Sequence, residues 1–235
     1  MREVIRGITW LLGTGYDCNV YIIESDGNSL LIDSGLGDKQ IYGVGLETNS
    51  LPLLRKMIKE KNINQVLLTH GHIDHVGGIM ALQSDFNFEI ITSDIEAKFL
   101  VQGKDSYIDP ILGSSCDPVK ISKTVKENDT IKIGKFIFKV LLTPGHTAGS
   151  ICLWDEAQNI LISGDTVFPQ GSFGRTDLPS GNSNQLILSL ERLAKLKINV
   201  LLPGHMSPQV SDNSDIISSS LQESYRSAKI MLSYY

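Results

Sequence analysis

The features that would direct a chain to a membrane or to nucleic acid are scarce in this sequence. No apolar run approaches the roughly 20 residues that span a bilayer, and the N-terminus, with Glu3 and Arg6 among a few apolar residues, lacks a signal-peptide core. The net charge is −5 and no stretch is dense in lysine or arginine, so a phosphate backbone finds no basic surface. These absences predict a cytoplasmic protein that binds neither membrane nor nucleic acid.

Cysteine is also scarce. The three cysteines, Cys18, Cys116 and Cys152, are far apart in the sequence, and none belongs to a Cys-x-x-Cys pair. An odd number of isolated cysteines argues against a disulfide framework, a zinc knuckle or a dithiol redox site. We interpret them as small buried apolar residues in a reducing compartment.

What the sequence does contain is typical of a folded globular protein, with 41% apolar and 20% charged residues. We expect a single domain over residues 1–235. Short apolar segments bounded by turn residues predict strands at Val20–Ile23, Ser29–Ile32, Gln65–Thr69, Glu89–Thr92, Lys135–Leu142, Ile151–Trp154, Asn159–Ser163 and Asn199–Leu202. Helical spacing of apolar residues predicts helices at Leu51–Lys61, Val76–Gln83, Asn184–Leu196 and Asp215–Leu232.

Two pairs of segments repeat within the chain. Val66-Leu67-Leu68-Thr69 before His70 is similar to Val200-Leu201-Leu202-Pro203-Gly204 before His205, and Leu30–Gly35 is similar to Ile160–Asp165. The repetition predicts two related β/α halves. The corresponding architecture is an α/β fold with a two-sheet core, outer helices and a site on the loops at strand ends.

The most informative segment is His70-Gly71-His72-Ile73-Asp74-His75. Offsets of two, four and five residues scatter these side chains around a helix axis, at about 100° per residue, so we expect all four polar residues on a loop. The following Gly77-Gly78 would let the backbone turn closely into the next helix. Imidazoles and a carboxylate are ligands for zinc, iron or manganese, and four of them can serve two ions.

A census of histidines strengthens the metal interpretation over that of a histidine-rich surface turn. The chain has five histidines, and the two outside the run, His146 and His205, each follow a Pro-Gly pair after an apolar strand. Asp165 follows another apolar strand beside Gly164. Seven candidate ligands divide naturally between two ions with open positions, which would lower the pKa of a bound water toward about 7 and favour hydrolysis.

The sequence is similar to the metallo-β-lactamase superfamily, whose His-x-His-x-Asp-His motif is matched at positions 70–75. The resemblance covers most of the chain, and four further motifs follow in the order of the family: Ile32-Asp33-Ser34-Gly35, Thr143-Pro144-Gly145-His146-Thr147, Ser163-Gly164-Asp165-Thr166 and Pro203-Gly204-His205. It implies a four-layer αβ/βα sandwich, with two mixed sheets and helices outside.

The resemblance also implies a ligand assignment for two divalent ions, of which zinc is favoured and iron or manganese are alternatives. The first ion would be held by His70, His72 and His146, and the second by Asp74, His75 and His205, with Asp165 as the bridge. Asp74 and Asp165 would lie around a metal-bridging hydroxide as the catalytic carboxylates. Asp33 would orient a ligand histidine, although a turn-forming aspartate fits its position equally well.

The branch of the superfamily is indicated by fewer residues. An aspartate at position 165, together with His75, departs from the usual zinc β-lactamase pattern, and Gly174-Arg175-Thr176-Asp177 resembles a segment of glyoxalase II-like hydrolases and persulfide dioxygenases. Arg175 could bind a substrate carboxylate or could pair with Asp177. About 30 residues follow His205, so we expect a short form without the C-terminal helical domain.

Several functions remain open from the sequence. The first is a dinuclear hydrolase that acts on a thioester or related ester, as a hydroxyacylglutathione hydrolase does; the second is a mononuclear iron persulfide dioxygenase using His70, His146 and Asp165. A lactonase or phosphodiesterase, and a non-enzymatic protein with structural metals, are the remaining interpretations. For the enzymes the expected partner is a small-molecule substrate, and the oligomeric state stays open.

Overall fold

The computed structural model describes residues 1–38, 50–103 and 117–232. The chain forms two compact units, Met1–Val125 and Lys126–Tyr235. They divide the chain between the repeated segments, as the expectation of two β/α halves requires, while the assignment of residues 1–235 to a single domain stays a prediction.

The first unit is built on a mixed sheet with the strand order β1-β2-β3-β4-β5-β6-β7. The strands from β1 to β4 are antiparallel to their neighbours, and those from β4 to β7 are parallel. Because parallel strands end at the same edge of a sheet, the residues that follow β4 and β5, Asp33 and Leu68 to His70, emerge side by side. The bounds are β1 Arg2–Ile5, β2 Ile8–Leu11, β3 Val20–Ser25, β4 Asn28–Ile32, β5 Gln65–Leu67, β6 Glu89–Ser93 and β7 Lys123–Val125.

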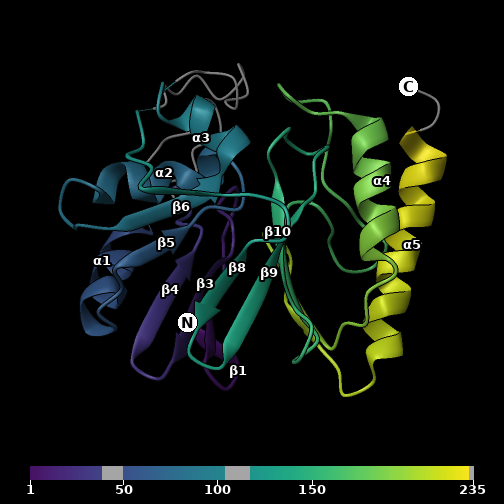
Figure 1. Ribbon diagram of the computed structural model, residues 1–235, viewed down its shortest axis with the longest axis horizontal. Coiled ribbons are helices and arrows are strands. Elements are labelled where there is room, and N and C mark those ends of the chain that lie inside the picture. Colours follow the sequence, from purple (N-terminus) through teal and green to yellow (C-terminus); the bar gives the residue numbers. More distant parts are fainter. Residues whose placement is uncertain (39–49, 104–116, 233–235) are drawn as a thin grey trace. The chain divides into compact units, whose positions relative to one another are not determined.

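Helices α1 Leu51–Glu60, α2 Ile73–Leu82 and α3 Asp94–Leu100 belong to this unit (Figure 1). One buried cluster contains alternate strand residues, such as Ile22 and Val66, together with Leu54 of α1 and Ile79 of α2. Burying one such side chain stabilises the fold by roughly 1.5–3 kcal/mol. The packing holds the start of α2 against the ends of β4 and β5.

The second unit is built on another mixed sheet, with the order β13-β12-β11-β10-β9-β8. Its neighbouring strands are antiparallel except for β11 and β12, which are parallel. The bounds are β8 Thr130–Ile133, β9 Phe136–Leu142, β10 Ile151–Asp155, β11 Ile160–Gly164, β12 Val200–Pro203 and β13 Gln209–Val210. Asp165 and His205 follow the two parallel strands and therefore emerge at one edge.

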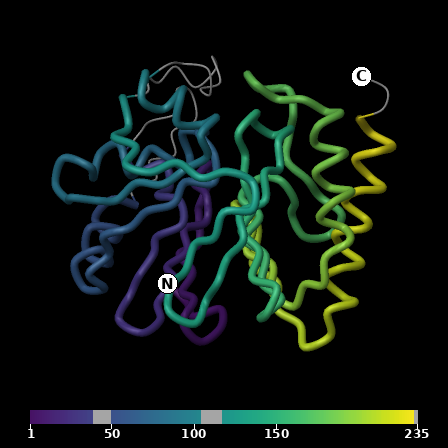
Figure 2. Tube along the Cα trace, viewed as in Figure 1, coloured from purple at the N-terminus to yellow at the C-terminus, as the bar shows by residue number. Residues whose placement is uncertain are grey.

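Helices α4 Ser183–Leu193 and α5 Ser214–Leu232 lie side by side in the second unit (Figure 2). Leu186 and Leu190 of α4 pack with Leu221 of α5 and with Leu161 and Leu201 of the sheet. Helix α4 begins at Asn182, whose side-chain oxygen accepts a hydrogen bond from the Gln185 N–H. Two helices therefore cover one face of this sheet.

Each strand and helix that we expected from the sequence coincides with an element of the structure to within three residues at either end. The sequence reading missed β1, β2, β7, β8, β13 and α3. All five missed strands have four residues or fewer, as the sequence Thr-Ile-Lys-Ile of β8 illustrates with its alternation of exposed polar and buried apolar residues. So short an alternation gives little signal when the surrounding sheet is unknown.

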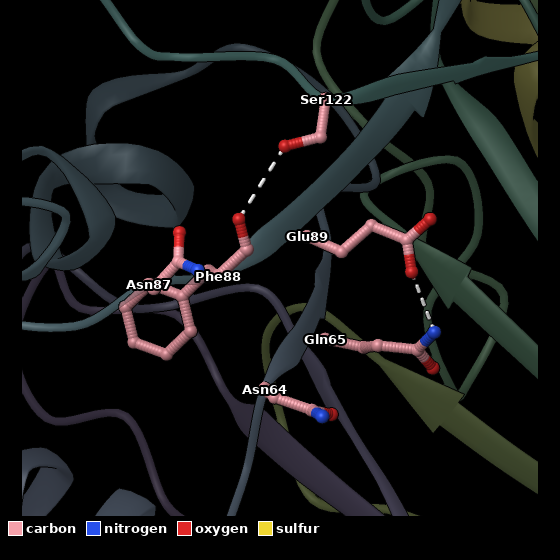
Figure 3. A pocket seen from close by; sticks show the side chains of 6 residues that line it. All are labelled: Asn64, Gln65, Asn87, Phe88, Glu89 and Ser122. Atoms are coloured by element: carbon pink, nitrogen blue, oxygen red, sulfur yellow. Dashed lines mark hydrogen bonds between the residues drawn. The ribbon is translucent and has the colours of Figure 1, made fainter.

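A polar cavity of about 340 Å³ lies at the starting ends of β5 and β6, the end of the sheet away from the histidine run (Figure 3). Gln65 Nε2 donates a hydrogen bond of 2.6 Å to Glu89 Oε2, and the Ser122 hydroxyl donates to the Phe88 carbonyl over 3.4 Å. These polar groups satisfy one another and tie β5, β6 and the loop before β7 together.

Candidate metal centre

Asp33, the first residue after β4, is a buried carboxylate in the first unit with a backbone φ of 57°. Its Oδ1 accepts the Thr69 N–H over 2.7 Å, and its Oδ2 accepts the Thr69 hydroxyl over 2.8 Å. The same Oδ2 lies 2.8 Å from Nδ1 of His75. An ionised carboxylate only accepts, so Nδ1 of His75 carries the proton and Nε2 keeps its lone pair.

His70 and His72 lie between β5 and α2 and are buried. The Thr69 hydroxyl, which donates to Asp33, lies 3.0 Å from Nδ1 of His70. Its oxygen therefore accepts from His70 Nδ1–H, and Nε2 of His70 keeps a lone pair. That nitrogen faces Nδ1 of His72 at 3.1 Å. Asp33 and Thr69 thus orient two histidine rings from outside.

The run does not lie wholly on a loop, and our prediction was wrong for its second half. His72 is the N-cap of α2, with an extended ψ of 146°, and the helix begins at Ile73. Asp74 and His75 consequently occupy the first turn, where helix N–H groups favour a negative charge such as that of Asp74. The scatter argument excluded one helix for all four residues, but it did not consider a division between loop and helix.

His146 lies between β9 and β10 in the second unit and is 2% exposed. Its Nδ1 lies 2.7 Å from the backbone carbonyl oxygen of Arg175. A carbonyl only accepts, so His146 donates from Nδ1 and keeps a lone pair on Nε2. The preceding Gly145 has a φ of 134°, and a Cβ there would lie 2.2 Å from the Leu186 nitrogen. A glycine is needed for this loop to approach α4.

Asp165 and His205 follow the parallel strands β11 and β12, whose ends are joined by a hydrogen bond of 2.8 Å from Gly204 N–H to the Gly164 carbonyl. The Asp165 side chain is 8% exposed, and that of His205 is 31% exposed. Oδ2 of Asp165 lies 3.5 Å from Nε2 of His146 and 3.4 Å from Nε2 of His205. One carboxylate oxygen is thus shared between two imidazoles of this unit.

Arg175 forms a two-point ion pair with Asp177, because its Nε and Nη2 each donate a hydrogen bond of 2.7 Å to that carboxylate. These hydrogen bonds lower the pKa of Asp177 to about 2. Both side chains are exposed. Of the two roles considered from the sequence, the structure shows the pairing with Asp177, and binding of a substrate carboxylate stays a prediction.

Gly174 brings the segment before Arg175 close to the candidate ligand groups of the second unit. A Cβ at this position would lie 1.9 Å from the Asp165 backbone oxygen and 3.0 Å from Nδ1 of His146. No side chain fits into that space. The backbone of the Gly-Arg-Thr-Asp segment therefore packs against Asp165 and His146. From the sequence we had considered only the side chain of Arg175, so this backbone contact was not predicted.

The donor groups in each unit fit divalent ions. Two ligands of one tetrahedral ion, each about 2.0–2.1 Å away, lie roughly 3.4 Å apart. The 3.1 Å between the His70 and His72 nitrogens is close to this value, and Oδ2 of Asp74 lies 3.6 Å from Nε2 of His75. In the second unit the histidine–carboxylate separations are 3.5 and 3.4 Å. Hydrogen bonds on the outer nitrogens are the usual support of metal-binding histidines.

Two other ionisable groups of the first unit, Asp17 and Cys18, lie near His75. Burial raises the pKa of Asp17 despite the hydrogen bond of 2.6 Å that its Oδ1 accepts from the Leu36 N–H. Burial also raises the pKa of the Cys18 thiol. In the second unit, burial raises the pKa of Cys152 to about 11. Cys18 and Cys152 are buried free thiols, as we predicted, and Cys116 lies outside the described residues.

Sequence reasoning missed the groups that hydrogen-bond to the candidate ligands from outside the site. Thr69 is one of them, and its position directly before His70 was the available signal. The Arg175 carbonyl is another, and no side-chain pattern could reveal it because a backbone oxygen is present at every residue. Such partners can be identified only when the fold brings distant segments together.

Comparison with known proteins identifies the class. A family model described as the metallo-beta-lactamase superfamily matches residues 13–205. The chain belongs to this superfamily of metallo-hydrolases, and the predicted α/β fold of two mixed sheets with flanking helices is confirmed.

The individual relatives have different printed functions. The chain is 35% identical to the hydroxyacylglutathione hydrolase GloC of Haemophilus influenzae, over 62% of this chain and 70% of the relative. It is 28% identical to the acyl-coenzyme A thioesterase MBLAC2 of Gallus gallus, over 86% of this chain and 78% of the relative. A metallo-beta-lactamase family protein of Thermus thermophilus matches with a TM-score of 0.77 and 18% identity, over 99% and 82% of the two chains.

One observation bears on the expectation that the protein does not bind a membrane. Among the helices of the described residues, none is long and apolar enough to cross a bilayer. The cytoplasmic location and the absence of nucleic-acid binding stay predictions.

Proposed function

We propose that this chain is a thioester hydrolase with a centre for two divalent ions. The observation that carries the proposal is the position of Asp165, whose Oδ2 faces both His146 and His205 at 3.5 and 3.4 Å. In the superfamily assignment these histidines serve different ions. A carboxylate oxygen placed between them suits a bridge.

The proposed assignment of ligands follows the superfamily motifs onto this chain. The first ion would be bound by His70, His72 and His146. The second would be bound by Asp74, His75 and His205, with Asp165 shared. We propose zinc as the metal, with iron or manganese as alternatives that the same nitrogen and oxygen donors accept. When bound, such ions supply a water of lowered pKa and a Lewis acid for a carbonyl oxygen.

The chain's own residues prepare this chemistry by fixing protons. Asp33 holds the His75 proton on Nδ1, and the Arg175 carbonyl holds the His146 proton on Nδ1. Each ring therefore presents Nε2 as the donor atom. Asp74 and Asp165 lie beside these nitrogens and remain the candidates for steering a proton during attack on the substrate.

The choice of a thioester is supported by the printed functions of two relatives, a hydroxyacylglutathione hydrolase and an acyl-coenzyme A thioesterase. Both split a thioester between an acyl group and a thiol carrier. We therefore propose an acyl thioester of a small thiol as the substrate class, with glutathione as the first thiol to test. Arg175 is proposed to contact a substrate carboxylate if it leaves Asp177.

The proposal is tested with purified, metal-quantified protein and S-lactoylglutathione. We expect about two ions per chain, release of thiol, and loss of the reaction after chelation with recovery on adding metal. The matched variants are His205→Ala, which removes a proposed ligand, and Lys229→Ala on the exposed side of α5, which removes none. If the protein leaves S-lactoylglutathione intact but hydrolyses lactones or phosphodiesters, the proposed thioester substrate is wrong.

A different result would favour the persulfide dioxygenase. That enzyme would contain one iron per chain and would consume oxygen with glutathione persulfide, while leaving S-lactoylglutathione intact. Both substrates should therefore be offered to the same preparation. The two outcomes differ in metal count, in co-substrate and in product.

A further inference from the structure

Ser34 lies between two backbone groups of α2 that normally pair with each other. In a regular α-helix the carbonyl of residue 75 accepts from the N–H of residue 79. Here the Ser34 hydroxyl donates to the His75 carbonyl over 2.9 Å and accepts from the Ile79 N–H over 2.8 Å. The Ser34 N–H also donates to the His75 carbonyl, at 2.8 Å. A side chain from outside the helix is thus inserted beside the hydrogen-bond ladder.

The two glycines that follow in α2 make this insertion possible. A Cβ on Gly78 would lie 2.0 Å from the Ser34 carbonyl oxygen, and a Cβ on Gly77 would lie 2.2 Å from that of Leu36. The Gly78 N–H in turn donates to the Gly35 carbonyl over 2.8 Å. The strand-end loop after β4 therefore packs directly on the backbone of α2, and Ser34 is wholly buried in the contact.

Consecutive residues consequently hold His75 at two places. Asp33 contacts the ring at Nδ1, and Ser34 contacts the backbone carbonyl through both its N–H and its hydroxyl. A ring contact alone fixes the protonated nitrogen but leaves the Cα position free to move with the helix. Both contacts together determine where Nε2 of His75 lies.

We propose that Ser34 is a positioning residue for His75, and that its hydroxyl tunes the affinity for the second ion. The inference rests on the proposed two-ion function. Partners of this kind, one contact removed from the metal, typically change metal affinity by about 10- to 100-fold when they are removed. Ser34 itself contacts no reacting atom in this assignment.

The test measures the affinity of each ion by competition with a chromophoric chelator. In Ser34→Ala we expect the second ion to bind about 10- to 100-fold more weakly and the first ion to keep its affinity. The Co²⁺ absorption of the second ion should change in parallel. Ser34→Thr retains the hydroxyl but adds a methyl group at a fully buried position, so it should bind the second ion more tightly than Ser34→Ala does while losing stability.

Ser29→Ala is the matched control. Ser29 is another buried serine and lies within β4, and its hydroxyl donates to the carbonyls of Lys61 and Asn62, just after α1, over 3.2 and 3.3 Å. It should lose stability without a change in the affinity for either ion. Equal weakening in Ser29→Ala and Ser34→Ala, or an unchanged second affinity in Ser34→Ala, would overturn the proposal.

A measurement on the unaltered chain covers the case in which Ser34→Ala does not fold. Because coupling between two sites is reciprocal, binding of the second ion should slow hydrogen exchange at the Ile79 amide. The Leu54 amide of α1, which donates to the Ser50 carbonyl, is the reference. Unchanged exchange at Ile79 would contradict the role of Ser34. A chain that binds only one ion would instead overturn the two-ion function itself.

Discussion

Both carboxylate oxygens of Asp33 accept hydrogen bonds, and replacing Asp33 with asparagine removes one of these two acceptors. In the native chain Oδ1 accepts the Thr69 N–H, while Oδ2 accepts the Thr69 hydroxyl and faces His75 Nδ1–H, all within 2.7–2.8 Å. The amide oxygen of asparagine can serve the Thr69 N–H, whose direction is fixed. The amide NH₂ would then face the His75 N–H, donor against donor.

The magnitude follows from that lost contact. A hydrogen bond to a charged group contributes about 1.5–3 kcal/mol, and each 1.4 kcal/mol changes an equilibrium constant about tenfold. His75 can avoid the clash by moving its proton to Nε2, but that nitrogen then has no lone pair for an ion. We expect Asp33→Asn to weaken the second ion by about 10- to 100-fold and to weaken the first ion less, because Asp33 reaches His70 only through the Thr69 hydroxyl.

The assay is a chelator competition titration that resolves two affinities, with thermal unfolding of the metal-free protein alongside it. Asp155→Asn is the control, because Asp155 is another buried aspartate and accepts 3.0 Å hydrogen bonds from the Ile137 N–H, the Gln158 N–H and Gln158 Nε2. It should lose stability without losing metal. Unchanged binding of both ions in Asp33→Asn would refute the reasoning.

Two further predictions concern backbone strain and the exposed ion pair. Gly145→Ala should lower the free energy of unfolding by roughly 3 kcal/mol or more, because the added Cβ would lie 2.2 Å from the Leu186 nitrogen. The control is Gly27→Ala, where φ is +75° but no atom lies near the added Cβ, and it should lower the free energy of unfolding by only about 1–2 kcal/mol. Urea titrations compare the two variants, and equal losses would contradict the steric argument. The pKa of Asp177, held at about 2 by Arg175, should return toward about 3.9 in Arg175→Ala when its carboxyl carbon is titrated by NMR. Since the folded pKa is the lower one, the pair's stabilisation is complete above pH ~4 and is lost as the pH falls toward 2; it should stay below about 1 kcal/mol because both side chains are exposed. An unchanged Asp177 titration would show that the pair does not form in solution.

The candidate ligands could be picked out from the sequence because most of them lie just after an apolar strand, beside a glycine, and their role as metal ligands stays a prediction. His205 after Val200–Pro203 and Asp165 after Ile160–Gly164 are examples, and the strand pattern carried most of that signal. Within each sheet, neighbouring parallel strands end at the same edge, so residue type and position along the chain were enough to pick out His70, Asp165 and His205 as candidates. The same reasoning predicted most strands and helices to within three residues.

The supporting contacts could not be predicted in this way. In the sequence Ser34 cannot be distinguished from other small residues of strand-end turns, because its role depends on the packing of α2 against it. The Arg175 carbonyl is a backbone group and has no sequence signal. The division of the histidine run between loop and helix was missed for a related reason. His72 has no side-chain capping hydrogen bond, so its N-cap role depends on packing of α2 rather than on capping chemistry.

The most direct test of the account is the metal content of the purified chain, measured together with its reactions. Mass-spectrometric metal analysis should find about two divalent ions per chain, and this preparation should hydrolyse S-lactoylglutathione without consuming oxygen. A single iron per chain, with oxygen consumed on glutathione persulfide and S-lactoylglutathione left intact, would contradict the proposed two-ion thioester hydrolase.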